Sequence, residues 1–116
     1  MALPKNRRIK LEKDFEKIFK SGRSVRHTLF LLKFLNSPLP YCRAAVAVPV
    51  SVSKQATIRN KLKRIFFSAL GEILPRCHSG IDLVIVVSSA AVKKTIYEIS
   101  KSLEEIFIKA NIVEGK

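Results

Sequence analysis

The sequence contains few acidic residues, two cysteines, two histidines and no long apolar run. No uninterrupted apolar segment approaches the roughly 18 residues that a membrane-spanning helix needs. The basic N-terminal segment leads into charged residues rather than an apolar stretch, which argues against a secretory signal. Cys42 and Cys77 do not form a CxxC pair, so reduced thiols fit better than a disulfide framework or a metal site. We therefore expect a soluble, cytoplasmic protein with no membrane partner.

The side chains that protein enzymes use for hydrolysis are also scarce. His27 precedes a predicted strand, and His78 lies in a predicted turn next to Cys77, an arrangement that suits metal binding poorly. The acidic residues are scattered, and Asp14 alternates with lysines, so we expect it to form a surface ion pair. No set of these residues meets the geometric requirements of acid–base or metal-assisted catalysis. We therefore expect neither a catalytic site nor a metal site within the chain itself.

The length and the hydrophobic content predict one domain. The chain has 116 residues, of which 47% are hydrophobic. A chain of this size buries roughly two thirds of its unfolded surface around a single core. No internal repeat, low-complexity tract or long linker divides it. We expect one domain over residues 1–116, with residues 1–8 and 112–116 as flexible tails.

The charge is strongly one-sided. Lysine and arginine number 22 against 9 acidic residues, which gives a formal net charge of +13. Residues 1–26 hold nine basic and three acidic side chains, and residues 54–76 hold six and one. A domain this basic repels itself unless a polyanion neutralises it. Nucleic acid is therefore the expected partner, and an acidic membrane surface is the alternative.

Hydrophobic periodicity predicts a first helix and two or three strands in the N-terminal half. The first helix carries apolar residues at helical spacing: Leu11, Phe15, Ile18 and Phe19. Gly22 is expected to end this helix in a left-handed conformation. Strands are predicted over residues 28–35 and 43–53, and in the second the valines at 46, 48, 50 and 52 share one face. Pro49 places that strand at an edge or breaks it into two.

The C-terminal half predicts helix, strand, helix. Seven apolar residues give the first of these helices a strongly amphipathic pattern: Ile58, Leu62, Ile65, Phe66, Ala69, Leu70 and Ile73. Residues 81–87 are apolar on both faces, as in a central strand. Thr95 and Glu98 form a capping box. The closing helix then carries Ile96, Ile99, Leu103, Ile106 and Phe107 on its apolar side.

The outward face of the helix that starts near Ile58 is cationic. It presents Arg59, Asn60, Lys61, Lys63, Arg64, Phe67 and Ser68. Arginine binds phosphate through two N–H groups, lysine supplies a point charge, and an asparagine amide can reach a 2′-OH or a base edge. A simple solvated surface is the alternative, but no acidic residue follows until Glu72. The pattern therefore favours an RNA-binding helix.

Three segments carry a resemblance to a known family. RNKLKR, residues 59–64, lies on an amphipathic helix after a valine-rich strand and resembles the RNR signature of the protein subunit of bacterial ribonuclease P. RRIKLEKDFEKIFKSGRSV, residues 7–25, is similar to the opening helix of that family, with its phenylalanine pair and following Gly-x-Ser. The later DLVIVV strand and the closing helix fall in the family's order and spacing.

The resemblance implies an α+β fold and a function. The fold is a single split domain of order αβββαβα, with about four strands in a mostly antiparallel sheet and a left-handed βαβ crossover, as in certain ribosomal proteins. Members bind a catalytic RNA, and that RNA uses Mg²⁺ to remove the 5′ leader of precursor tRNA. The holoenzyme is an endoribonuclease in which the protein assists and the RNA cuts. The implied partners are the RNA subunit and precursor tRNA, with no obligatory protein partner.

The resemblance also implies site residues. Positions matching the signature that faces the catalytic RNA are Arg59, Asn60, Lys61, Lys63 and Arg64. Phe15 and Phe19 match aromatics that line a cleft for the single-stranded leader, whose unpaired bases stack on rings with little regard to sequence. The alternative for both phenylalanines is a place in the core, where helical aromatic stripes usually lie.

Three positions depart from the family pattern. Lys54 either keeps one of the family's lysine pair or belongs to the connecting loop. Lys33 stands where several members have an aromatic residue in the leader cleft, and phosphate attraction would replace stacking there. Phe67 stands where an arginine is common. We expect it either to stack on a nucleoside of the RNA or to pack on a neighbouring loop.

Two function classes remain after these steps. One is an accessory subunit of an RNA enzyme, and the other is a structural RNA-binding protein of ribosomal type. Both predict the positive charge and salt-sensitive RNA binding. The order of the phenylalanine helix and the RNKLKR helix favours the first class.

Overall fold

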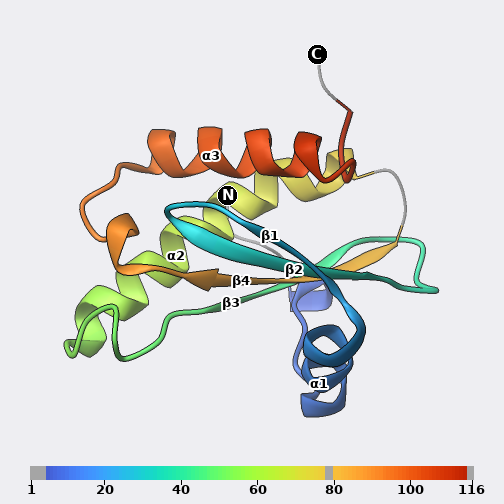
Figure 1. The fold of residues 1–116 in the computed structure, drawn as a ribbon, viewed down its shortest axis with the longest axis horizontal. Coiled ribbons are helices and arrows are strands. Elements are labelled where there is room, and N and C mark those ends of the chain that lie inside the picture. Colours follow the sequence, from blue (N-terminus) through green and yellow to red (C-terminus); the bar gives the residue numbers. More distant parts are fainter. Residues whose placement is uncertain (1–4, 78–79, 115–116) are drawn as a thin grey trace.

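One four-stranded sheet, with helices on both sides, organises the chain (Figure 1). The computed structural model describes residues 5–77 and 80–114. The helices and strands are α1 (Glu12–Ser21), β1 (Arg23–Arg26), β2 (Phe30–Asn36), β3 (Arg43–Ala47), α2 (Ala56–Ile73), β4 (Ile81–Val87) and α3 (Ile96–Lys109). Three short 3-10 turns are η1 (Lys5–Arg7), η2 (Leu74–Arg76) and η3 (Ser89–Ala91). None of the described helices is long and apolar enough to cross a membrane.

The strand order in space is β1-β2-β4-β3. β2 pairs antiparallel with both β1 and β4, whereas β3 pairs parallel with β4. Parallel neighbours need a long crossover, and α2 supplies it between β3 and β4. The order αβββαβα and the mostly antiparallel sheet are confirmed, and the hand of the crossover stays a prediction.

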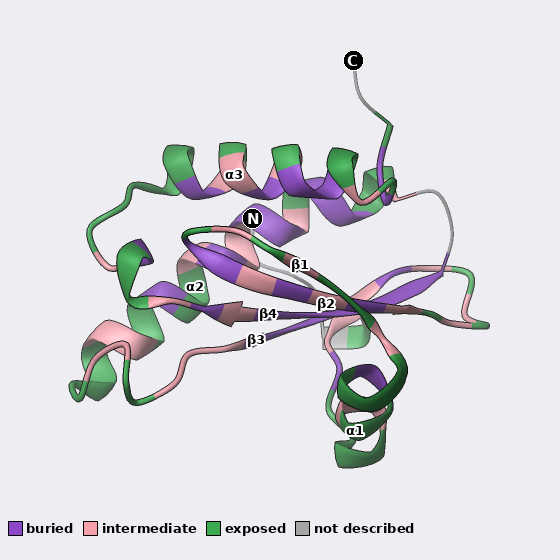
Figure 2. Cartoon of the chain, in the orientation of Figure 1, coloured by how far each residue is buried: buried purple, intermediate pink, exposed green. Residues whose placement is uncertain are grey.

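The larger core lies between the sheet and the pair α2 and α3. Alternate residues of β2 point into it, namely Phe30, Leu32 and Phe34, and β4 contributes Leu83 and Ile85. Figure 2 shows α3 with its buried side toward the sheet and its exposed side outward. The predicted apolar face of α2 is confirmed, because five of its seven residues are buried and the other two, Ile58 and Ile65, are half-buried against the core. The capping box that starts α3 is also present.

A smaller core lies on the opposite side of the sheet, beneath α1. Its buried members are Ile9, Ile18, Ala45 and Val84. Ile18 is the only α1 residue that is fully buried, while Phe15 packs against this cluster half-buried. α1 is therefore a mostly exposed helix that a few apolar contacts hold on the sheet.

An arginine-centred ion-pair cluster adds a second attachment for α1. Arg43 of β3 donates from Nε and Nη2 to the Asp82 carboxylate of β4, at 2.9 and 2.6 Å. Its Nη2 also lies 3.5 Å from the Asp14 carboxylate of α1, so Asp14 does form an ion pair, but a half-buried one with the sheet rather than the expected surface pair. The hydrogen bonds to Asp82 raise the pKa of Arg43, so the cation is fixed. One guanidinium thus joins two strands and a helix.

The predicted length of one strand and the predicted conformation of Gly22 are wrong. The strand predicted to reach residue 53 ends at Ala47, because the chain turns at Pro49 and the amide of Val52 donates to the Pro49 carbonyl, which leaves Val50 exposed. The edge position that Pro49 indicated is confirmed, because β3 lies at one edge of the sheet. Gly22 is extended rather than left-handed. A side chain there would overlap the carbonyl oxygens of Ile18 and Phe34, so close backbone approach explains this glycine.

Two residues at the starts of helices, which were predicted to face the core, are exposed. Leu11, expected inside, precedes α1 and is 56% exposed, and Ile96, expected to face the core, is 48% exposed. Both residues lie at the ends of helices, where the packed face begins only one turn later.

Described residues at the inner ends of both predicted flexible tails contact the rest of the fold, and the flexibility of the tails stays a prediction. Arg8 forms a parallel bridge with Ala44, and the amide of Ile9 donates to the Ala44 carbonyl at 3.0 Å. At the other end, Ile112 and Val113 are buried, and Val113 bridges to Cys77. Residues 1–4 and 115–116 of these predicted tails lie outside the described residues.

We expect Asp82→Asn to lower the free energy of unfolding by about 1.5–3 kcal/mol, because it removes a charged hydrogen-bond partner from a mostly buried arginine. Urea unfolding measures the change. The control is Glu105→Gln, which alters an exposed carboxylate on α3 and should shift stability by no more than about 0.5 kcal/mol. Equal stability of Asp82→Asn and wild type would show that the pair contributes nothing net.

Candidate nucleic-acid interface

The outward side of α2 presents the predicted cationic surface. Asn60, Lys61, Lys63 and Arg64 are exposed, and Arg59 is half-buried. Their direction follows from the buried residues of α2, which fix the opposite side against the sheet. We call these five residues the α2 surface.

The cations of the α2 surface lack acidic partners. None of them forms an ion pair within residues 5–77 and 80–114. The first turn of α2 also has no acidic residue, although acids are favourable there. These charges therefore remain available to an external anion.

Arg59 also has a structural contact. Its Nη1 donates to the Ser53 carbonyl at 2.8 Å and so ties the segment before α2 to the helix. Lys54 lies exposed in that same segment, outside β3 and α2. The structure therefore places Lys54 in the connecting loop, close in sequence to the start of the α2 surface.

Phe67 lies between the cationic surface and the core. It packs half-buried against the larger core, and the guanidinium carbon of Arg8 lies 4.8 Å from its ring centroid. Arg8 and Phe67 line a hollow with Asn60, Lys63, Arg64 and Ser68. Arg8 was not predicted to lie beside the α2 surface, because only the fold brings the N-terminal segment next to α2.

The second predicted surface lies on the other side of the sheet. Phe19 of α1 is 45% exposed, and Nζ of Lys33 lies 5.5 Å from its ring centroid. Phe15 is half-buried beside them on the smaller core. We call Phe15, Phe19 and Lys33 the α1 surface. The structure brings these three predicted residues together, with an aromatic ring and a cation both reachable from solvent.

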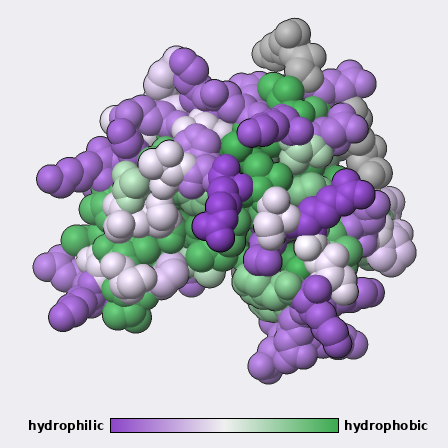
Figure 3. Space-filling view, viewed as in Figure 1, coloured by the Kyte–Doolittle hydropathy of each residue, from purple (hydrophilic) through white to green (hydrophobic). Residues whose placement is uncertain are grey.

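The sheet continues beyond α1 on this side. Leu31, Ala47 and Val86 are half-buried there and alternate with residues of the larger core. α1 stands over one end of the sheet in Figure 1. In the space-filling view, hydrophilic side chains project from α1 and α3, and apolar area is visible between them (Figure 3). Partly apolar surface beside the exposed Phe19 suits bases, which present flat apolar faces.

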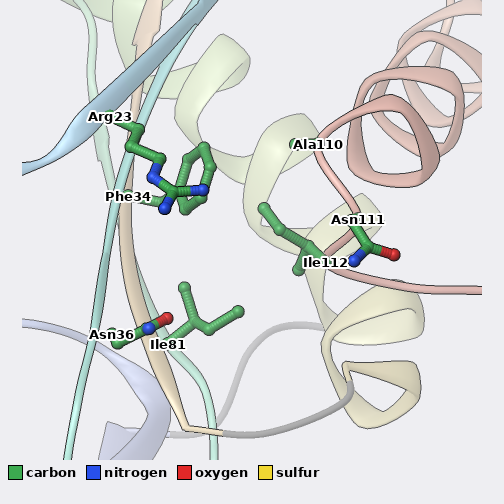
Figure 4. Close-up of a pocket in the computed structure, with 7 residues that line it drawn as sticks. All are labelled: Arg23, Phe34, Asn36, Ile81, Ala110, Asn111 and Ile112. Carbon is green, nitrogen blue, oxygen red and sulfur yellow. The ribbon is translucent and has the colours of Figure 1, made fainter.

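A further hollow of about 340 Å³ lies between the end of β2 and the C-terminal end of α3 (Figure 4). Its lining is Arg23, Phe34, Asn36, Ile81, Ala110, Asn111 and Ile112. Figure 4 shows Arg23 and Phe34 side by side, facing Asn111 and Ile112. Among the described residues, this lining has no carboxylate, histidine or thiol that could form an acid–base pair.

The histidines and possible metal ligands give no cluster among the described residues. Nδ1 of His27 accepts a hydrogen bond from the Leu29 amide at 3.0 Å, and the ring stacks on Phe30. His27 therefore has a local structural role. His78 lies outside the described residues. Within the described ranges, no three of His, Cys, Asp and Glu gather as they would around a metal ion.

Comparisons with known proteins agree with this arrangement. The ribonuclease P protein component of a Synechocystis species is 31% identical over 115 residues, covering 98% of this chain and 93% of that protein. A Staphylococcus aureus RNase P protein, a mutant with defective mRNA degradation activity, superposes with a TM-score of 0.85 at 28% identity and covers 93% of this chain and 91% of its own. The Thermotoga maritima RNase P protein gives 0.79 at 25% identity, with coverage of 93% and 98%. The sequence model of the family described as Ribonuclease P matches residues 3–111, and the chain therefore belongs to the ribonuclease P protein family.

Proposed function

We propose that the chain is the accessory subunit of a ribonucleoprotein endoribonuclease. In this proposal the α2 surface binds the catalytic RNA, and the α1 surface binds the single-stranded 5′ leader of precursor tRNA. The protein thereby assists the Mg²⁺-dependent removal of the leader, and Mg²⁺ serves the RNA. The observation that carries the proposal is the separation of two RNA-suited surfaces by one sheet.

The α2 surface suits a folded RNA through its charges. Four cations without acidic partners on one side of a helix can neutralise several phosphates and release their counterions. Asn60 among them can donate and accept hydrogen bonds with a 2′-OH. We include Lys54 in this contact because it lies exposed just before α2.

Phe67 belongs to the same proposed contact. The hollow of about 430 Å³ that it lines with Arg8, Asn60 and Lys63 combines an aromatic ring, cations and an amide. A base can stack on a ring or on a guanidinium plane, so this combination suits an unpaired nucleotide of the RNA.

The α1 surface suits a single strand of variable sequence. Phe19 offers a ring for stacking, and Lys33 offers a charge for a phosphate close to the same ring. Stacking needs no particular base, so the same surface can accept the leaders of different tRNAs. Phe15 lies one turn before Phe19 on α1 and packs half-buried on the smaller core.

The direct test is reconstitution. Addition of the purified protein to a bacterial ribonuclease P RNA at low Mg²⁺ should stimulate 5′ processing of precursor tRNA, because cations reduce repulsion between the two RNAs. Cleavage is followed by gel electrophoresis of labelled precursor. RNA binding without any stimulation would favour a structural RNA-binding protein instead.

The double variant Arg59→Ala/Arg64→Ala should weaken assembly with the RNA and reduce the slope of log affinity against log salt by about 2. Binding is measured by filter retention at several salt concentrations. Lys101→Ala/Lys109→Ala removes the same charge from the exposed side of α3 and should leave most of the slope intact. Thermal unfolding of both variants is the control, since Arg59 also holds Ser53. An unchanged slope in a folded Arg59→Ala/Arg64→Ala protein would contradict the assignment.

Phe19→Ala should weaken binding of precursor tRNA to the reconstituted holoenzyme by about 1–3 kcal/mol, because one stacking contact is lost. Binding of tRNA without a leader should not change. The control is Tyr97→Ala, which removes a 71% exposed aromatic ring from α3. An equal loss with and without the leader would place Phe19 outside the leader contact.

A further inference from the structure

Two cysteines that are distant in sequence meet in the fold. Cys42 immediately precedes β3, and Cys77 immediately follows η2. Both line one hollow of about 200 Å³, together with Arg7, Tyr41 and Leu74 among others. The Cys42 side chain is buried and that of Cys77 is half-buried. The hollow therefore gives a small molecule a route to both sulfur atoms.

The backbone around both cysteines is fixed by contacts with the rest of the fold. Cys42 adjoins Arg43, whose side chain is fixed by Asp82. The amide of Cys77 donates to the Leu74 carbonyl at 3.0 Å, and Cys77 also bridges to the buried Val113. Both cysteines thus belong to segments that are anchored on the fold.

A hydrogen bond makes the two thiols chemically different. The Cys77 thiol donates to the Cys42 sulfur, which lowers the pKa of Cys42 and raises that of Cys77. Burial opposes ionisation of both thiols, and the positive charge of Arg7 favours it. The thiolate therefore forms on Cys42, while Cys77 keeps its proton. A thiolate near a cation is the usual environment of a reactive cysteine.

We propose that Cys42 and Cys77 are a peroxide-sensitive dithiol that oxidises to an intramolecular disulfide. The Cys42 thiolate attacks one oxygen of hydrogen peroxide, the O–O bond breaks, and hydroxide leaves to become water on protonation. The Cys77 thiol then displaces water from the Cys42 sulfenic acid and forms the S–S bond. In sum, two thiols and one peroxide give one disulfide and two waters.

The disulfide would join the two ends of the segment that contains β3 and α2. Cross-linking the ends of this segment restricts the unfolded chain more than the folded one, so the oxidised protein should be the more stable form. The outward residues of α2 belong to the middle of the segment, and their exposure does not depend on the thiols. The modification therefore acts on stability, independently of the proposed role in RNA processing.

The test treats the folded wild-type protein with equimolar hydrogen peroxide. We expect both thiols to be lost to thiol reagents and the intact mass to fall by about 2 Da, as a disulfide requires. Tm should rise by roughly 10 °C, and dithiothreitol should reverse every change. On a non-reducing gel the protein should stay monomeric.

Two single-cysteine variants, and the oxidation products of the wild-type protein, distinguish an intramolecular disulfide from other oxidation. Cys77→Ser should gain oxygen on Cys42 or form intermolecular dimers, and Cys42→Ala should react with peroxide more slowly than Cys77→Ser, with no rise in Tm in either variant. If one variant does not fold, the other variant and the wild-type protein still test whether the two cysteines form the disulfide. Wild-type protein that keeps both thiols, gains oxygen instead of losing hydrogen, or forms only intermolecular dimers would overturn the proposal.

Discussion

The bidentate pair between Arg43 and Asp82 is the contact on which the position of the α1 surface depends. It fixes the start of β3 against β4 at the parallel pairing, and the same guanidinium reaches Asp14 on α1. α1 has only one fully buried side chain, so apolar packing alone holds it weakly. The position of Phe19 over the sheet therefore depends on an electrostatic attachment that is largely shielded from water.

Acidic residues pair with some of the basic residues of this protein and not with others. Several acidic side chains stabilise the fold through ion pairs, as Asp82 and Asp14 do with Arg43 and as Glu104 does with Arg76. The α2 surface has no such partner among the described residues, which costs stability through repulsion but leaves its cations ready for phosphate. The ion-paired acidic residues and the unpaired cations of the α2 surface are therefore different groups in different parts of the described chain.

Much of the fold could be predicted from periodicity, and the failures have physical causes. α2 and β4 have long, regular apolar patterns, so both were found, and the inward and outward sides of α2 were predicted correctly. β1 has four residues, three of them exposed and the fourth half-buried, so its sequence has no pattern to detect. The α2 surface followed from helical periodicity and also matches the family signature, whereas the roles expected of Phe15, Phe19 and Lys33 came from family resemblance alone. Arg8 on Phe67 and Cys42 beside Cys77 depend on contacts between distant segments, which no local pattern encodes.

The N-terminal segment has a consequence for self-association. A sheet edge with unpaired backbone groups is a template for another chain. At the β3 edge, the bridge of Arg8 to Ala44 and the hydrogen bond from Ile9 occupy such groups. At the opposite edge, β1 is short and carries two exposed arginines, Arg23 and Arg26. Salt or a bound polyanion screens the repulsion between these basic molecules. The β3 and β1 edges described above still disfavour strand pairing between two copies under those conditions.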